Sequence, residues 1–168
     1  MRIILRTAAG DIELSLDADK APLSVANFLR YVDAGRYDGG RFHRTVTPAN
    51  QPDNKIKIEV IQAGPKPGAE EFPPVKLERT RDTGRRHKDG TVSMARDEPD
   101  TATGDFFVCV GDQPELDFGG KRNPDGQGFA AFGRVTKGMD VVRAIQKGKA
   151  DGQTLTPAVA IVSAKRMG

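Results

Sequence analysis

Short runs of alternating apolar and polar residues, separated by turn-forming residues, make up most of the chain. The first two runs, 1–6 and 11–16, flank TAAGD and predict a β-hairpin. About eight short strands are expected in all, and such a set favours a β-sandwich or a closed barrel. The remaining strand candidates are 41–46, 55–64, 75–79, 91–96, 106–111, 129–135 and 158–167.

Two segments carry apolar residues at helical spacing instead. Residues 22–34 do so before Gly35, and residues 138–148 do so up to Gly148, so each ends where a helix stop is expected. Two helices are too few for a fold of alternating strands and helices. No internal repeat or low-complexity linker divides the chain, so residues 1–168 are interpreted as one domain.

The charged residues do not indicate a nucleic-acid partner. Lys and Arg number 26 against 23 Asp and Glu, and this net charge of +3 is scattered. A nucleic-acid interface would need clustered basic residues. Only 79–88 is locally basic, and it is interpreted as a solvated surface that includes His87.

Hydropathy and the sulfur and imidazole side chains exclude further classes. No apolar stretch is long enough to span a membrane, and residues 1–16 lack the apolar region of a signal peptide. A cytoplasmic location is expected, with a periplasmic one as the alternative if a signal peptide was removed upstream. Cys109, the only cysteine, is expected to be a buried, inert thiol. With two histidines and no nucleotide-binding motif, neither a metal site nor a cofactor is expected.

Four segments in order along the chain carry a family resemblance. They are KAPLSVANFLRYVDAGRYDGGRFHR (20–44), DGTVSMAR (89–96), GDFFVCVGDQPELD (104–117) and GFAAFGRVTKGMDVVRAI (128–145). The chain resembles the cyclophilins, the peptidyl-prolyl cis-trans isomerases or rotamases, and its bacterial members in particular. The resemblance implies a mainly β fold, a closed eight-stranded antiparallel β-barrel capped by two α-helices.

The same resemblance implies a shallow groove on the outside of the barrel. Arg44 is the expected catalytic residue, and Gln62 would orient it or bind the substrate backbone. His43 is expected more to tie strands together than to touch substrate, and Met94 is equally compatible with pocket and core. Phe106 and Val108 are expected to face the core. The full set of expected substrate-binding residues is His43, Val60, Gln62, Met94, Ala95, Arg96, Asp105, Phe107, Leu116 and Phe129.

The chemistry needs no nucleophile and no metal. Rotation about an X-Pro bond meets a barrier of about 18–20 kcal/mol because the amide is conjugated. In the twisted amide the nitrogen regains a lone pair, to which a fixed and always charged guanidinium can donate. An apolar pocket would hold the proline ring while the other side of the bond turns.

The sequence departs from the family beside the groove. Arg44 and Gln62 are separated by an insertion that includes TPANQPDNKI, and Glu59 and Val60 stand where most members carry Phe-Met. Glu59 would lower activity if it entered the groove, whereas a shift of register would turn it to solvent. Both orientations are compatible with the sequence.

Further departures concern ligand preference. Arg96 replaces a usual Asn, Asp105 a usual Gln, and Glu115 the Trp with which eukaryotic members bind cyclosporin. Weak or no cyclosporin binding is therefore expected, together with an altered preference for charged residues around proline.

The favoured function is a prolyl isomerase that assists protein folding, as a chaperone does. Its partners would be proline-containing peptides and unfolded proteins, with no nucleic acid, no membrane and no second copy of the chain. The alternative is a catalytically weak module that binds proline peptides on the same fold.

Overall fold

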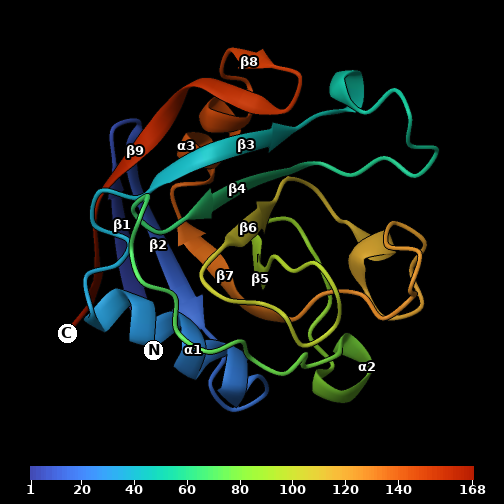
Figure 1. Ribbon diagram of the computed structural model, residues 1–168, viewed down its shortest axis with the longest axis horizontal. Helices are drawn as coiled ribbons and strands as arrows, with labels where there is room; N and C mark the ends of the chain where they lie inside the picture. Colours follow the sequence, from blue (N-terminus) through green and yellow to red (C-terminus); the bar gives the residue numbers. More distant parts are fainter.

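The computed structural model describes all 168 residues, and its central feature is a sheet that closes on itself (Figure 1). Nine strands form the sheet; one of them, β8 (Ala150–Asp151), pairs only with β9, and the other eight close because β1 pairs with both β2 and β9. All pairings are antiparallel, and the closure of the sheet makes it a barrel rather than a sandwich. The order around the barrel is β1 (Arg2–Thr7), β2 (Gly10–Leu16), β7 (Ala131–Lys137), β5 (Thr91–Met94), β6 (Phe106–Cys109), β4 (Val60–Gly64), β3 (Arg41–Val46) and β9 (Thr154–Arg166).

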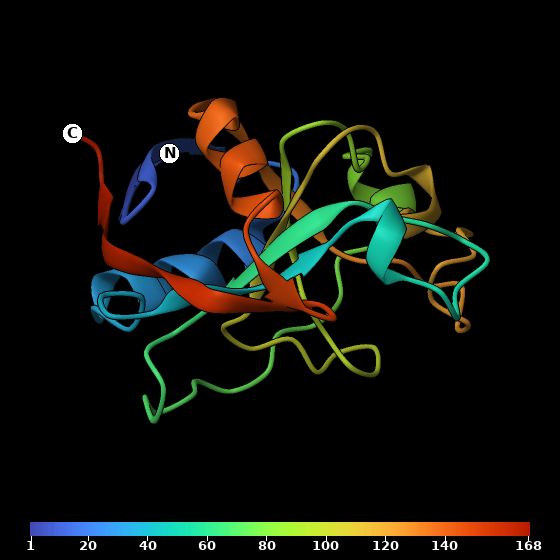
Figure 2. The same ribbon diagram turned by 90° about the horizontal axis from the view of Figure 1, so that it is seen from above.

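The two predicted helices cover opposite ends of the barrel (Figures 1 and 2). Helix α1 (Pro22–Asp33) buries Phe28 against the aromatic rings of the barrel interior, and α3 (Met139–Gln146) buries Val142 and Ile145. Their apolar faces complete the core at each end. The structure adds a short helix, α2 (Thr80–Thr83), and two 3₁₀ turns, η1 (Pro48–Asn50) and η2 (Pro114–Leu116).

Two of the predicted strands are absent or halved in the structure, and the strand predicted over 158–167 begins earlier, at Thr154. Residues 75–79 form only an isolated bridge, between Val75 and Ala102. In the segment 55–64 the strand begins at Val60. Residues 55–58 make no backbone bond to a neighbouring strand, and Glu59 only accepts one from Val110, just past β6. Alternation alone could not exclude either segment, because it does not show whether a partner strand lies alongside.

Side chains of the barrel strands pack on both sides of the wall. Phe106 and Val108 of β6 point into the main core, as predicted, whereas Phe107 and Cys109 point outward. The outward residues belong to a second apolar cluster on the outer surface. This outer cluster comprises Val46, Ile58, Val60, Phe107, Cys109 and Leu116.

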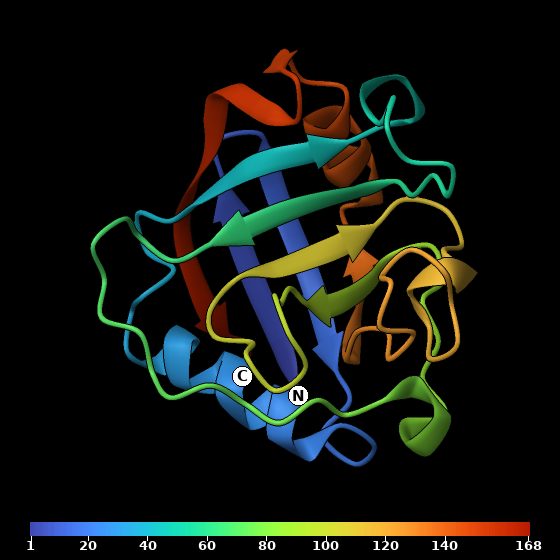
Figure 3. The ribbon, with the colours of Figure 1, turned by 45° about the vertical axis from the view of Figure 1, so that its right-hand side comes forward.

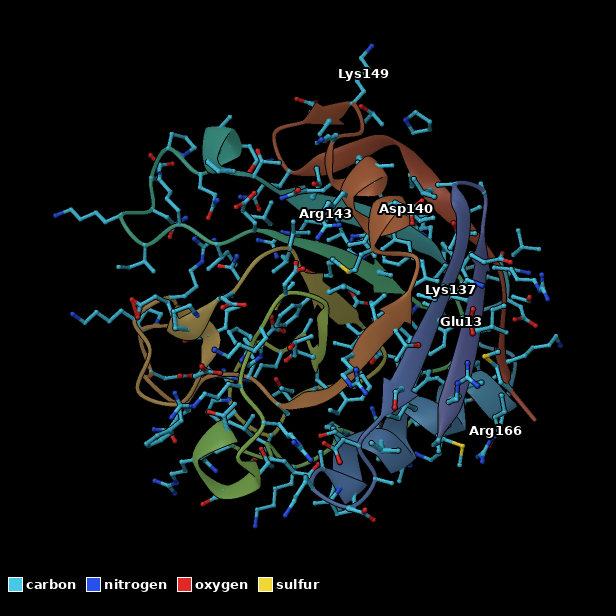
Figure 4. All side chains as sticks on the ribbon, turned by 180° about the vertical axis from the view of Figure 1, so that it is seen from behind. Glu13, Lys137, Asp140, Arg143, Lys149 and Arg166 are labelled. Atoms are coloured by element: carbon cyan, nitrogen blue, oxygen red, sulfur yellow. The ribbon has the colours of Figure 1, made fainter.

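The back of the molecule is a charged surface (Figure 4). Glu13 of β2 lies 3.9 Å from Lys137 of β7, and Arg143 of α3 lies 3.1 Å from Asp89. Surface pairs of this kind contribute little stability. None of the helices combines the length and the apolar character that crossing a membrane would require.

Candidate active site

Arg44 points out of the barrel because of a bulge in β3. Phe42 pairs with Ala63 and Arg44 with Gln62, so His43 is an extra residue between two regular pairs. In a regular strand, residues two positions apart face the same side, so Arg44 would point inward with Phe42, which is fully buried in the core. The bulge therefore allows a core phenylalanine and an outward arginine two positions apart.

Two glutamines hold the Arg44 guanidinium. Its Nη1 donates to Oε1 of Gln62 at 2.9 Å, and its Nε donates to Oε1 of Gln153 at 2.9 Å. Gln62 lies directly opposite Arg44 on β4, and Gln153 lies in the turn between β8 and β9. Burial lowers the pKa of Arg44, but a guanidinium starts so far above neutrality that it remains charged. Nη2 is left without a partner in the protein.

Arg44 lies in a groove of about 530 Å³ over the outer cluster. Strands β3, β4, β6 and β5 run side by side beneath this region, with the loops 47–59 and 117–128 beyond one end of the strands and the loop 65–74 beyond the other (Figure 3). Of the predicted site residues, the groove brings together Arg44, Val60, Gln62, Ala95, Arg96, Asp105, Phe107, Leu116 and Phe129.

The floor of the groove is an apolar pocket built around Phe107. The Phe129 ring meets the Phe107 ring edge-on at a centroid distance of 5.5 Å. Val60 and Leu116 are buried beside them. Apolar side chains on several sides and an open top make this hollow suitable for a proline ring.

The Phe107 ring is supported from below by His87. The two rings are nearly parallel, with centroids 5.9 Å apart, and His87 is only 1% exposed. The interpretation of His87 as part of a solvated surface was therefore wrong. Its Nδ1 lies 2.7 Å from Oδ1 of Asp117 and its Nε2 lies 2.8 Å from Oγ of Ser93.

This Ser-His-Asp chain does not form a hydrolytic site. Ser93 is fully buried and does not line the groove, so its hydroxyl cannot reach a substrate. The three side chains satisfy one another beneath Phe107 and so fix the floor of the pocket.

Glu59 lies outside the groove. Its carboxylate accepts a hydrogen bond of 3.1 Å from Nε2 of Gln146 on α3. Successive side chains point to opposite sides here, so Ile58 and Val60 both face the groove while Glu59 between them faces away. Ile58 lines the groove and is 6% exposed. Ile58 thus provides the wall expected to be missing with the family's phenylalanine.

Two predicted substrate-binding residues are not part of the groove lining. Met94 is 1% exposed and belongs to the main core, because β5 turns it inward. His43 links β3 across β4 to the residue before β6 instead: its Nε2 lies 3.0 Å from Oδ2 of Asp105, which also accepts a 2.9 Å bond from Nε2 of Gln62 on β4. Asp105 does line the groove, with its carboxylate held by these two side chains.

Arg96 forms a rigid part of the rim. It donates to both carboxylate oxygens of Asp125, at 2.9 and 3.1 Å, and its guanidinium lies 4.8 Å from the Phe129 ring centroid. The hydrogen bond lowers the pKa of Asp125. Arg96 is therefore neutralised by its partner and unavailable as a free charge.

Three groove or positioning residues were missed at the sequence level. Ile58 comes from the loop after η1, Arg122 from the loop after η2, and Gln153 from a turn far along the chain. The alternation of Ile56, Ile58 and Val60 was the one available signal, and it indicated correctly that Ile58 and Val60 share a face. Nothing in the sequence indicated Arg122 or Gln153.

Comparison with known proteins matches this geometry. The family model described as cyclophilin type peptidyl-prolyl cis-trans isomerase matches residues 2–166. Peptidyl-prolyl cis-trans isomerase A of Dickeya dadantii is 42% identical over 86% of this chain and 70% of its own length. The isomerase cyp18 of Streptomyces antibioticus is 39% identical over 98% and 97% of the two chains.

A solved structure shows the same fold at lower identity. The cyclophilin-type isomerase of Cryptosporidium parvum, crystallised in the presence of the dipeptide Ala-Pro, has a TM-score of 0.77 at 18% identity and covers 100% of this chain and 99% of its own. The closed barrel is therefore the cyclophilin fold. The chain belongs to the cyclophilin-type peptidyl-prolyl cis-trans isomerase family.

Proposed function

We propose that this chain accelerates rotation about X-Pro bonds by donating a hydrogen bond from Arg44 to the twisted amide. The observation that most supports this proposal is the position of the Arg44 guanidinium. Gln62 and Gln153 hold it beside the apolar pocket, and its Nη2 is free to donate. A donor fixed before the substrate arrives needs no reorganisation as the lone pair develops.

The pocket supplies the second part of the mechanism. Ile58, Val60, Phe107, Leu116 and Phe129 would hold the proline ring, while the preceding residue turns in the open part of the groove. The Ala95 N–H is bonded to the backbone oxygen of Asp105, so the Ala95 carbonyl and the Arg96 backbone would pair with the extended peptide. Lowering the barrier by about 5–7 kcal/mol would accelerate the step roughly 10⁴- to 10⁵-fold.

Two observations favour catalysis over the alternative of a weak binding module. Glu59 is engaged by Gln146, so it does not neutralise Arg44, and Ile58 completes the pocket wall. The test is NMR exchange spectroscopy on a blocked Ala-Ala-Pro-Phe peptide with and without the protein. Faster exchange supports an enzyme. Shifted peptide signals with exchange at the uncatalysed rate would identify the chain as the binding module.

The expected ligands are proline-containing segments of unfolded proteins. The Cryptosporidium relative crystallised in the presence of Ala-Pro is consistent with proline-peptide binding in this groove. Glu115, in place of a tryptophan, supports weak or absent cyclosporin binding. Calorimetry that gave a dissociation constant in the nanomolar range would contradict it.

A monomer in the cytoplasm that binds no nucleic acid remains part of the proposal. Large exposed hydrophobic side chains are confined to Met1, Leu23 and Val162, which is consistent with a chain that needs no second copy. Sedimentation analysis of the purified chain tests the monomeric state directly.

A further inference from the structure

Arg122 places a second unpaired positive charge in the groove. Both Arg44 and Arg122 line it, and neither guanidinium is bonded to a carboxylate. Arg96, the third arginine of the lining, is already neutralised by Asp125. Partial burial, and after it the charge of Arg44, lower the pKa of Arg122, and the second effect is the repulsion between the two cations.

The position of Arg122 is fixed by the insertion. Its Nη1 donates to Oε1 of Gln51 at 2.6 Å and to the backbone oxygen of Ile56 at 2.7 Å. Gln51 is itself buried and bonded to the backbone of Thr47 and Ile58. Nε and Nη2 of Arg122 have no partner in the protein. A rigid guanidinium with free donors is suited to binding a carboxylate.

The carboxylates of the lining do not fill this role. Asp105 is held by His43 and Gln62. Glu71 and Asp97 are exposed and come from loops that neither contain Arg122 nor hold it. One part of the groove thus offers unpaired cations and another offers exposed acids.

We propose that Arg122 makes this enzyme prefer peptides with an acidic residue next to the proline. The preference rests on the proposed isomerase function and adds a substrate class to it. A glutamate carboxylate bound to Arg122 would relieve the repulsion between Arg122 and Arg44. It would also leave Arg44 free to serve the amide, because Arg122 has its own free donors.

The test compares four blocked peptides in the exchange assay. Ala-Glu-Pro-Phe is paired with Ala-Gln-Pro-Phe, and Ala-Ala-Pro-Glu with Ala-Ala-Pro-Gln, so that charge is the main change on each side of proline. The wild type should favour glutamate in at least one pair by about fivefold in kcat/KM, as for a solvent-screened ion pair, and less at high salt.

Arg122→Gln should bring that ratio close to one. Lys121→Gln, an equal loss of charge at a neighbouring exposed residue outside the groove, should keep it. Arg122→Lys preserves the charge and should retain part of the ratio, and circular dichroism checks that each variant is folded. A wild-type ratio near one in both pairs, or one that survives Arg122→Gln, would overturn the inference.

The two proposals fail in different ways. Equal acceleration of all four peptides removes only the acidic preference. Acceleration of none removes the proposed isomerase function, and the preference with it.

Discussion

The side chains of Arg44 and Gln153 meet at 2.9 Å although 109 positions separate them in the sequence. Gln153 is held in turn, because its Nε2 donates to the backbone oxygen of Asn50 at 3.1 Å. The turn before β9 and the start of the insertion therefore together position the guanidinium that we propose as the catalytic donor.

Gln153→Ala should lower kcat/KM by about three- to tenfold, because a lost hydrogen bond of about 1 kcal/mol lets Arg44 leave its productive orientation. In an Arg44→Ala background the same substitution should cost nothing further, since residues that act through one another are not additive. Gln127→Ala, which removes a glutamine bonded to Arg79 instead, is the matched control. Equal losses in both backgrounds would show that Gln153 does not act through Arg44.

Ile58→Ala tests the wall of the pocket. Removing a buried isoleucine side chain should reduce the free energy of unfolding by about 2 kcal/mol and raise KM, because the proline ring loses contacts on one side. Urea denaturation and steady-state kinetics measure the two effects. The same substitution at Ile4, a half-buried residue of β1 outside the groove, should leave KM unchanged. An unchanged KM in Ile58→Ala would mean that the proline ring does not reach this wall.

The residue pattern predicted the helices and left a barrel and a sandwich open, and the family resemblance supplied the barrel and most of the groove. Alternation in FFVCV separated the inward Phe106 from the outward Phe107 correctly, because a strand has only two faces. Met94 was open to both interpretations, since the ends of a short strand such as β5 do not show which face meets the core.

The remainder depended on contacts between distant segments. The burial of His87 could not be predicted from RTRDTGRRHKDG, because Asp117 and Ser93, which satisfy the ring, lie elsewhere in the chain. The orientation of Glu59 could likewise not be predicted, because Gln146, which donates to its carboxylate, lies far away in the sequence. The loop that carries Arg122 lacks a repeating pattern from which its path could be inferred, and the alternation before Val60 showed only which face Ile58 shares.

Asp117 links stability to pH. Burial acts to raise the pKa of this carboxyl, but hydrogen bonds from His87 outweigh it, so the pKa lies below its usual value. The folded protein thus binds fewer protons, and this stabilisation is present above about pH 4 and is lost as the pH falls through the depressed pKa. Urea midpoints measured from about pH 6 to about pH 3, on both sides of the ordinary aspartate pKa, should decline at the acid end.

The decline should be shallower in Asp117→Asn, which is also less stable at neutral pH because its amide accepts more weakly. Some decline should remain, since Arg166 and Arg96 lower the pKa of Asp33 and Asp125 in the same direction. An identical slope in wild type and Asp117→Asn would contradict the assignment.

The most direct test is the isomerisation rate of one peptide with wild type, Arg44→Ala and Arg44→Lys, measured by exchange spectroscopy at saturating peptide. A fixed donor removed from a developing charge should lower kcat by about 10²- to 10³-fold. Lysine should recover little of the lost rate. Its three N–H groups share one nitrogen, so they cannot reproduce the planar arrangement in which Nε and Nη1 bond to the two glutamines and Nη2 faces the groove. If Arg44→Ala turns the peptide over at nearly the wild-type rate, the amide is not eased through its twist by this guanidinium.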